Sequence, residues 1–336
     1  MRPNDPSTPE DAQCPQAVAS FPGPVLVTGG GGFIGHHLIT ALLARGCTVR
    51  NLDFTPGRIN ATALSHWRGS FMDAALLREA LFGVDTVFHL AATTLPRDSQ
   101  ADPERDAREN LLGTIALLDM AVSTGVRRIV FCSSGGTVYG HALRAPIDED
   151  HPTNPITAYG ISKLAIEKYL RLYSTQHGIA TVSLRIANPY GPFQNIAKAQ
   201  GAVTTFCNNA LNDRMIDIWG DGSVERDFVH VRDVAAALLR AGQSGASGTE
   251  INIGSGQGTS LNHLVSEIAR TLGRPVRHRY LQGRSFDVPQ NFLDISRARR
   301  VLGWAPSIPL STGLRDLVSF MRSAADPIDS DTPDAC

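Results

Sequence analysis

The 336-residue chain predicts an α/β fold, in which a doubly wound parallel sheet is joined to a smaller, interleaved α/β lobe. Short runs rich in β-branched residues alternate with longer amphipathic stretches, which is typical of repeated βα units with helices on both faces of a sheet. After Arg185 this alternation loosens into loops that carry Pro and Gly. The second half is therefore expected to form a partner lobe interleaved with the end of the sheet.

Each expected element follows from its local pattern. The strands of the first half are expected at Pro24–Thr28, Thr48–Leu52, Thr86–Leu90, Arg128–Cys132 and Ala180–Leu184. Its helices are expected at Ile34–Ala44, Ala74–Leu81, Asn110–Ser123 and Ala158–Tyr173. The second half adds helices at Val231–Ala241 and Leu261–Leu272 and a strand at Glu250–Ile253. We divide the chain into tails at 1–20 and 325–336, a sheet domain at 21–187 to which segments at about 229–254 return, and a lobe made of 188–228 and 255–324.

Composition excludes several classes of protein. Lys and Arg total 31 against 32 Asp and Glu, so the chain lacks the basic field that nucleic acid or an anionic membrane attracts. No apolar run approaches the ~18 residues of a membrane span, and residues 1–20 lack the apolar core of a signal peptide. The five Cys are scattered without metal-ligand spacing, so we expect reduced thiols, a cytoplasmic location and no metal site. His36, His37 and His230 are expected to pack or cap rather than bind metal.

A glycine-rich segment joins the first strand to the first helix. Residues 28–35 read TGGGGFIG and satisfy G-x-G-x-x-G with Gly30, Gly32 and Gly35. Lacking Cβ atoms, such a loop turns sharply and lets a pyrophosphate approach the positive end of the helix, so the segment predicts a Rossmann-type dinucleotide site. Asp53 ends the second strand, where a carboxylate binds ribose hydroxyls and repels a ribose phosphate, which favours NAD over NADP. An exposed acid in a turn is the alternative, and Arg58 nearby keeps NADP open.

A tyrosine and a lysine lie one helical turn apart in Tyr159-Gly-Ile-Ser-Lys163. The Lys163 cation and a positive nicotinamide ring would both lower the pKa of the phenol from its ordinary value of about 10, making Tyr159 a usable base. The alternative is a chance pair on a helix surface.

Several motifs occur together in the order seen in one superfamily: Thr28–Gly35, HLAA at 89–92, NLLGT at 110–114, SSGGTVYG at 133–140, YGISK at 159–163 and LRIANPYGP at 184–192. The chain resembles the extended short-chain dehydrogenases/reductases, and within them the NAD-dependent sugar epimerase/dehydratase family. WGDG at 219–222, RDFVHVRD at 226–233, NIGSG at 252–256 and LGWAP at 302–306 extend the resemblance over roughly residues 24–322.

The resemblance implies a set of NAD contacts. The pyrophosphate is expected at Gly29, Gly32 and Gly35 with Phe33 and Ile34, the adenosine ribose at Asp53, the adenine at Ser70 and Phe71, the dinucleotide groove at Leu90, Ala91, Ala92 and Asn110, and the nicotinamide ribose at Tyr159 and Lys163.

The resemblance also implies an activity, nucleotide-sugar 4-epimerisation of the UDP-glucose/UDP-galactose type. In such enzymes the tyrosine removes the proton of the sugar 4-hydroxyl while hydride passes to NAD. The bound 4-keto sugar then presents its other face to the cofactor, and the hydride and the proton are returned. The family places a hydroxyl residue where this chain has Gly135. Ser134 is our first choice to supply the hydroxyl, with Ser133 and Thr137 as substrate-contacting alternatives. Gly136–Thr137 replaces the acidic pair of the dehydratases, which argues against elimination.

Substrate contacts are expected in the second half. The resemblance implies diphosphate binding by Arg226, Arg284 and Asn188, a ribose contact at Asp287 and a base flanked by Ile218 and Trp219. For each, a surface ion pair or a packing role is the alternative. A UDP-sugar substrate and a homodimer built on the helices at Asn110–Ser123 and Ala158–Tyr173 are expected. A 4-ketoreductase using NAD(P)H and a non-catalytic dinucleotide-sensing protein remain as alternative functions.

Overall fold

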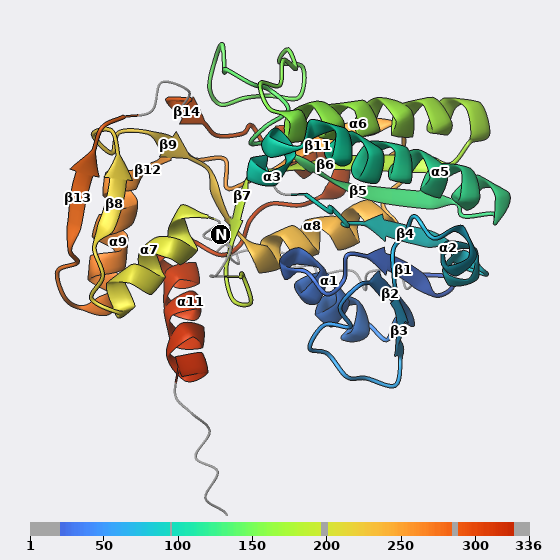
Figure 1. Ribbon diagram of the computed structural model, residues 1–336, viewed down its shortest axis with the longest axis horizontal. Coiled ribbons are helices and arrows are strands. Elements are labelled where there is room, and N and C mark those ends of the chain that lie inside the picture. The colour runs from blue at the N-terminus through green and yellow to red at the C-terminus, as the bar shows by residue number, and fades with distance from the viewer. Residues whose placement is uncertain (1–20, 95, 196–200, 284–287, 326–336) are drawn as a thin grey trace, which may run out of the picture.

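A seven-stranded, wholly parallel sheet forms the larger part of the protein (Figure 1). The computed structural model describes residues 21–94, 96–195, 201–283 and 288–325. The strands are β1 (Val25–Thr28), β2 (Val49–Asp53), β3 (Leu64–Arg68), β4 (Thr86–His89), β5 (Arg128–Ser134), β6 (Ala180–Ile186) and β11 (Thr249–Ile253), in the order β11-β6-β5-β4-β1-β2-β3. The order reverses between β1 and β4, and the crevice beyond the carboxyl ends of strands at such a reversal is where α/β sheets bind ligands.

Helices cover both faces of the sheet. Helices α1 (Phe33–Leu43) and α8 (Val231–Gln243) pack on one face, and α2 (Ala74–Leu81), α5 (Gly113–Ser123) and α6 (Ala158–His177) pack on the other. All of β1 is buried between these two layers, which explains its continuous apolar sequence. The doubly wound α/β fold expected from the sequence is confirmed. In the part of the chain that the structure describes, no helix combines the length and apolar character needed to cross a membrane.

Two segments differ from the expected elements. Strand β3 at the sheet edge was not predicted, because only Leu64 of its five residues is buried and the other four carry polar groups. The expected helix at 110–123 is instead a π-helical segment, η1 (Ala107–Leu112), that continues into α5. Two short helices, α3 (Pro96–Ala101) and α4 (Pro103–Asp106), precede it. The segment after β4 is thus irregular, as π-helical turns often are near functional sites.

The lobe has its own apolar core. Its helices are α7 (Ala202–Leu211), α9 (Leu261–Leu272) and α11 (Leu310–Ala325), with α10 (Ser296–Leu302) against β11 of the main sheet. Its short strands are β7 (Asn188–Tyr190), β8 (Ile216–Trp219), β9 (Glu225–Arg226), β10 (Phe228–His230), β12 (Thr259–Ser260), β13 (His278–Leu281) and β14 (Gln290–Asn291). Strand β11 belongs to the main sheet and α8 packs on that sheet, whereas the segments around them belong to the lobe. The chain therefore passes between the two parts repeatedly (Figure 1).

Candidate active site

The glycine loop closes so tightly on itself that side chains are excluded. Gly29 has a φ of 75°, and a Cβ on Gly35 would lie 2.4 Å from the Gly29 carbonyl oxygen. Gly32 is the N-cap of α1 without a side-chain cap, so the first amides of the helix are left for a ligand. The Gly31 amide donates to Asp53 Oδ2 at 3.0 Å, which joins the loop to the end of β2. This is the cradle that a pyrophosphate group requires.

A cavity of about 510 Å³ opens beside this loop at the reversal of the strand order. It is lined by eight of the predicted cofactor residues: Gly29, Gly32, Asp53, Ser70, Phe71, Leu90, Ala91 and Ala92. Gly69, which begins the segment expected at the adenine, also lines it. Its other lining residues, which were not predicted as cofactor contacts, are Leu52, Phe54, Met72, Thr93, Arg105 and Glu109. Phe33, Ile34 and Gly35 begin α1 just beyond it. Asn110 does not line the cavity itself but contacts a residue that does, since its Oδ1 accepts a hydrogen bond from the amide of the lining residue Thr93 at 2.9 Å.

The Tyr159–Lys163 pair lies in the first turns of α6, where Thr157 caps the helix by accepting from the Gly160 amide. A Cβ on Gly160 would lie 2.7 Å from the Thr137 carbonyl oxygen, so the glycine lets the start of α6 approach the segment after β5. Lys163 is buried; its Nζ donates to the Cys132 carbonyl at 2.8 Å and lies 5.5 Å from the centre of the Tyr159 ring. The end of β5 thus fixes Lys163 beside the phenol.

The pKa of Tyr159 departs from the sequence expectation. Burial raises it, and the neighbouring Cys132 and Asp106 raise it further. Burial lowers the pKa of Lys163, which Cys132, Asp106 and Glu167 oppose. In the protein alone, burial therefore outweighs the lowering that we expected Lys163 to exert on the phenol, because desolvation penalises the phenolate. A positive charge brought by a ligand is needed to reverse the direction.

Close packing explains why a glycine occupies position 135. A Cβ there would lie 2.6 Å from Leu293 Cδ1 and 3.0 Å from the Arg185 carbonyl oxygen, and Leu293 is buried. A serine side chain at 135 would therefore point into this packed region.

The three candidate hydroxyls have different surroundings. Ser133 is 4% exposed and donates to Glu167 Oε1 at 2.5 Å, so the expectation of a substrate contact is wrong for its side chain. Thr137 Oγ1 is buried and has no hydrogen-bond partner among the described residues. Ser134 is half-buried, and its hydroxyl likewise bonds to none of the residues that the structure describes. Because side chains alternate along a strand, Ser134 shares the face of β5 with Cys132, the thiol that influences the pKa of Tyr159.

The predicted substrate residues of the lobe differ in accessibility. Ile218 is fully buried in the lobe core, so its side chain cannot flank a base, whereas Trp219 is 40% exposed. Arg226 donates to the Val288 carbonyl at 2.7 Å. Asn188 donates to the Asp227 carbonyl at 3.1 Å and joins β7 to β10. The other two, Arg284 and Asp287, lie outside the described residues.

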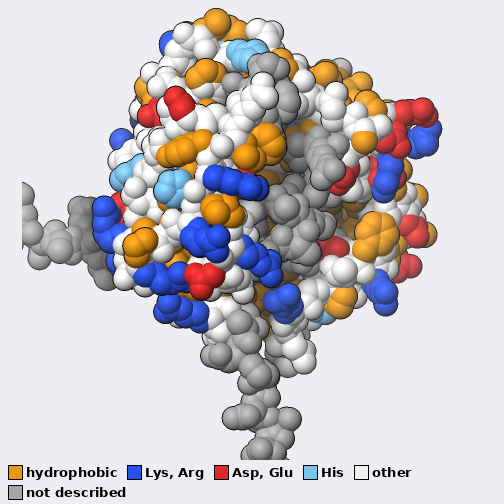
Figure 2. Space-filling view, turned by 60° about the vertical axis from the view of Figure 1, so that its left-hand side comes forward, with side chains coloured by type: hydrophobic (Ala, Val, Ile, Leu, Met, Phe, Trp, Pro, Cys, Tyr) orange, Lys and Arg blue, Asp and Glu red, His pale blue; other side chains and the backbone are white. Residues whose placement is uncertain are grey.

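Basic side chains gather on the lobe in Figure 2. In the lobe, Arg274 pairs with Asp213 and Arg279 pairs with Asp217, all on the surface. Such exposed pairs contribute little energy and mark a solvated face rather than a phosphate site.

The histidines make packing and capping contacts. The His36 ring lies 4.0 Å from that of Phe193, and His37 Nε2 is 3.0 Å from the Pro192 carbonyl oxygen. His230 caps α8 by accepting from the Arg232 amide. Within the described residues, no three His, Cys, Asp or Glu side chains are grouped to hold a metal ion.

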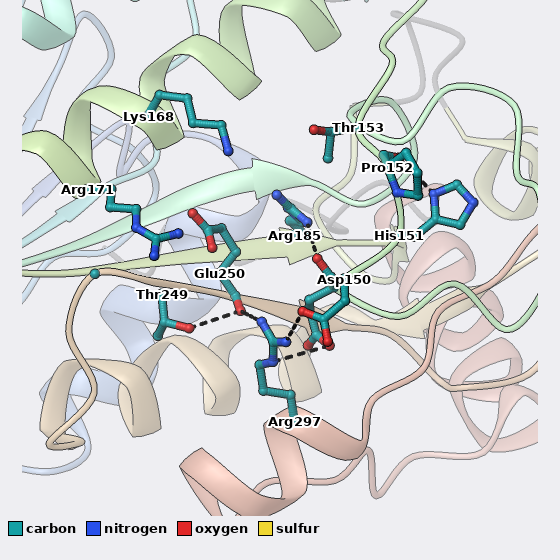
Figure 3. Close-up of a pocket in the computed structure, with 12 residues that line it drawn as sticks. Asp150, His151, Pro152, Thr153, Lys168, Arg171, Arg185, Thr249, Glu250 and Arg297 are labelled. Atoms are coloured by element: carbon teal, nitrogen blue, oxygen red, sulfur yellow. Dashed lines mark hydrogen bonds and ion pairs between the residues drawn. The ribbon is translucent and has the colours of Figure 1, made fainter.

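A second cavity, of about 390 Å³, lies at the β11 edge of the sheet and is lined by none of the predicted site residues. Figure 3 shows Lys168 and Arg171 reaching toward it from α6 and Arg297 from the opposite side. Arg297 Nη2 bonds Asp150 Oδ1 at 2.8 Å, so part of the charge in the wall is paired internally. Both acids (Glu149, Asp150 and Glu250) and bases (Lys168, Arg171, Arg185 and Arg297) line the wall, which gives no single ligand charge a clear preference.

Sequence reasoning missed a buried polar group beside the Tyr–Lys pair. Asp106 is 0% exposed and accepts hydrogen bonds from Thr94, Asn110 and Ser162. Its one signal in the sequence is spacing, since it lies one helical turn before Asn110. His89 was also passed over as a functional group; it is buried and bonds Thr28 and Thr114.

A glycine cradle at a helix start, an acid after the next strand and a Tyr–Lys pair at the start of α6 define a dinucleotide-binding protein of the extended short-chain dehydrogenase/reductase type. The chain belongs to the NAD dependent epimerase/dehydratase family, whose sequence profile matches residues 25–254.

Known relatives are similar over most of the chain. A UDP-glucose 4-epimerase of Mycolicibacterium smegmatis is 38% identical over 309 residues, which are 89% of this chain and 98% of the relative. A dTDP-4-dehydro-6-deoxyglucose reductase of Escherichia coli is 32% identical over 89% of this chain and 97% of its own. The crystal structure of the Thermotoga maritima UDP-glucose 4-epimerase with UDP-glucose has a TM-score of 0.84 at 34% identity, covering 90% of this chain and 100% of that one. The protein is thus an enzyme of the nucleotide-sugar epimerase type.

The cofactor of the family is NAD, and the site fits it. A Cβ at Gly29 or Gly35 would occupy the backbone space that the loop needs to turn, and the adjoining cavity carries an acid, Asp53, for a ribose. When bound, NAD supplies the acceptor and later the donor of a hydride.

Proposed function

We propose that this chain is a nucleotide-sugar 4-epimerase acting on a UDP-sugar of the glucose/galactose type, with Tyr159 as the base and Lys163 as its partner. The observation that carries the proposal is the placement of this pair at the start of α6 beside the end of β5, with Lys163 bonded to the Cys132 carbonyl. The similarity to named 4-epimerases supports the same reaction class.

The proposed roles follow from proton transfer. Tyr159 accepts the proton of the sugar 4-hydroxyl and returns it after the ring has turned its other face, so the stereocentre inverts without net redox change. Ser134 hydrogen-bonds the 4-oxygen, because it is the hydroxyl on the Cys132 face of β5 that no described residue engages. Lys163 holds its positive charge beside the phenol and favours the phenolate.

The proposed ligand contacts divide between the two parts of the protein. We assign NAD to the glycine loop with Phe33 and Ile34, to Asp53, and to the residues that line the 510 Å³ cavity. We assign the nucleotide diphosphate to Arg226, Asn188 and Arg284, the ribose to Asp287 and the base to Trp219. Guanidinium groups suit a diphosphate because their planar fork matches its oxygens.

A 4-ketoreductase is the second candidate, favoured by the similarity to the E. coli reductase. Both enzymes use a Tyr–Lys pair, but a reductase consumes NAD(P)H in each turnover. A dinucleotide-sensing protein without catalysis is the third candidate.

Addition of UDP-galactose to the purified protein, followed by the NADH absorbance band and by NMR of the sugar, separates the three. Formation of UDP-glucose without net NADH change supports epimerisation. Stoichiometric NAD(P)H loss with a 4-keto sugar supports the reductase, and no sugar chemistry supports the sensor. The Tyr159→Phe variant is the control for contaminating activity.

We further propose a homodimer built on α5 and α6. Four large apolar side chains are exposed on or beside these helices: Leu112, Ile161, Tyr169 and Leu172. The last three recur along one side of α6 at helical spacing, which is the pattern of a helix that packs against a partner.

We also propose a cytoplasmic location, because the cysteines of the described residues are unpaired thiols. Cys47, Cys132 and Cys207 are free thiols, and burial raises the pKa of each. Protonated, unpaired thiols suit a reducing compartment.

A further inference from the structure

Lys163 is a charged group in an environment that opposes charge. It is 5% exposed, and within the described residues its one hydrogen bond goes to the neutral Cys132 carbonyl. The Phe131 ring, whose centre lies 4.5 Å from Nζ, makes a cation–π contact that offsets only part of the desolvation. None of the ion pairs among the described residues includes it. Because burying an unpaired ammonium is costly, some negative charge has to offset the desolvation.

Titratable groups face Lys163 from each element packed around it, and they include Tyr159, a phenol on the same helix whose pKa is raised by burial. Cys132 on β5 is a half-buried thiol whose pKa is raised by desolvation. His89 on β4 is uncharged at neutral pH, since burial lowers its pKa to about 3. Glu167 on α6 is fully buried but pairs with Arg185 on β6 at 2.7 Å, so the two charges largely cancel. Asp106 at the end of α4 is left as the net negative charge.

The hydrogen bonds of Asp106 stabilise a carboxylate without neutralising it. Thr94 accepts a hydrogen bond from Asn110 Nδ2 at 2.9 Å, which leaves its own hydroxyl proton for Asp106. Asn110 Nδ2 donates to Asp106 Oδ1 at 2.9 Å, and the Ser162 hydroxyl donates to Oδ2. All three donors are neutral, and no described cation forms an ion pair with Asp106.

These hydrogen bonds also join three segments of the site. Thr94 follows β4 next to the cavity-lining Thr93, Asn110 belongs to η1, and Ser162 lies between Tyr159 and Lys163 on α6. A displacement of Asp106 would therefore move the start of α6 relative to the cavity wall.

We propose that Asp106 is a positioning residue of the candidate active site, which anchors the Tyr159–Lys163 turn through Ser162 and supplies the counter-charge of the buried Lys163 ammonium. The catalytic part of this inference rests on the proposed function. The electrostatic part concerns the protein alone. It agrees with the direction in which Asp106 shifts the pKa of Lys163.

The test is Asp106→Asn, read by NMR titration of Lys163 in protein labelled at the lysine ε-carbons, with Lys163→Met to assign the signal. The amide keeps an oxygen for Thr94 and Asn110 and places an NH₂ on the Ser162 hydroxyl, so the charge is removed with little change of shape. We expect the pKa of Lys163 to fall by about one unit or more. Glu104→Gln is the matched control, because it removes an exposed carboxylate of the same helix and leaves this pKa unchanged.

An unchanged pKa of Lys163 in Asp106→Asn, with the circular dichroism of the parent, would overturn the proposal and leave Asp106 a structural group. If Asp106→Asn does not fold, Asp106→Ser removes the same charge with a smaller side chain and is read in the same way. In active enzyme, the acid limb of kcat should move to lower pH, since a carboxylate that disfavours the phenolate is gone. Failure of the parent to epimerise any UDP-sugar would count against the proposed function and leave the Lys163 titration as the test of Asp106.

Discussion

Adjacent serines at the end of β5 provide a test in which two similar substitutions have opposite consequences. Ser133 and Ser134 differ by one position, and alternation along the strand directs them to opposite faces. Ser133 donates to Glu167, which is fully buried in its ion pair with Arg185. Ser134 carries the hydroxyl that we assign to the sugar 4-oxygen. Ser133→Ala should therefore affect stability, and Ser134→Ala should affect turnover.

The magnitudes follow from the partners. A hydrogen bond to a charged group contributes about 1.5–3 kcal/mol, and Glu167 Oε1 keeps a bond from Arg185 Nε at 3.0 Å, which favours the lower end. Ser133→Ala should lower the free energy of unfolding by about 1.5 kcal/mol, or Tm by about 2 °C for a chain of this length, with kcat near that of the parent. Ser134→Ala loses no hydrogen bond within the described structure, so its stability should stay within about 0.5 kcal/mol. Its kcat should fall about 100- to 1,000-fold, as for other donors to a developing oxyanion.

The assay combines thermal melts by circular dichroism with NMR of UDP-galactose conversion, in all variants at equal NAD content. Ser266→Ala is the matched control, since it removes an exposed hydroxyl on α9 that donates to the Asn262 carbonyl and belongs to none of the predicted site residues. It should leave kcat unchanged. Equal loss of kcat in Ser133→Ala and Ser134→Ala would refute the assignment of the two serines to different faces of β5. Full activity of Ser134→Ala would remove Ser134 from the mechanism.

Four further outcomes are expected. Gly35→Ala should abolish stable NAD retention, because its Cβ would lie 2.4 Å from the Gly29 carbonyl; NAD released on denaturation measures this, and full retention would contradict the cradle. Tyr159→Phe should lower kcat at least 100-fold with an unchanged melt, whereas activity near that of the parent would exclude the phenol as base. The pKa of His89 is lowered to about 3, so it binds a proton in the unfolded chain first, and stability should fall as pH drops from about 6.5 toward 3. Urea unfolding at pH 7 and 5 should show a shallower loss in His89→Gln, and an equal loss would contradict its neutral burial. Leu172→Glu should shift the sedimentation of the proposed dimer to that of a monomer; an unchanged coefficient would argue against α6 as the interface.

Local patterns were sufficient for most of the sheet. The strands from β1 to β6 that the sequence predicted are rich in buried β-branched and apolar residues, because both faces of the sheet are covered. Strand β3 lies at the edge and buries only Leu64, so its Ser, His, Trp and Arg give no strand signal by hydropathy. Pairing with β2 holds it, and pairing is not visible in a local window.

The sequence could predict that the glycine loop and Asp53 lie together, because that prediction depends only on short spacing. The loop and the end of β2 are joined by one hydrogen bond, from Gly31 to Asp53, across two adjacent strands of a predictable unit. The faces of Ser133 and Ile218 could not be found in this way. Ser133 is turned inward by a buried ion pair between α6 and β6, and Ile218 by a core assembled from α7, α9 and α11.

The reason for the glycine at 135 could not be predicted from the local sequence either. In the sequence it is a missing hydroxyl, whereas in the fold it is a position where Leu293, distant along the chain, leaves no room for a side chain. Leu293 is held there by its own contacts, since its amide donates to Asp227 and the neighbouring Asp294 amide to the Ile147 carbonyl. A larger residue at 135 would displace this packed segment at a cost of about 1–3 kcal/mol.

Glu167 and Asp106 show why charge near the Tyr–Lys pair cannot be counted from the sequence. Both are buried acids close to Lys163, and Glu167 is the nearer along the chain, one helical turn away. Yet Arg185 compensates Glu167, while neutral donors surround Asp106, so the more distant acid provides the uncompensated field. That field has two effects, since it favours the Lys163 ammonium and disfavours the Tyr159 phenolate. In the protein alone the Tyr159 phenol is therefore held protonated, and a cationic ligand in the site would be needed to favour its ionised form.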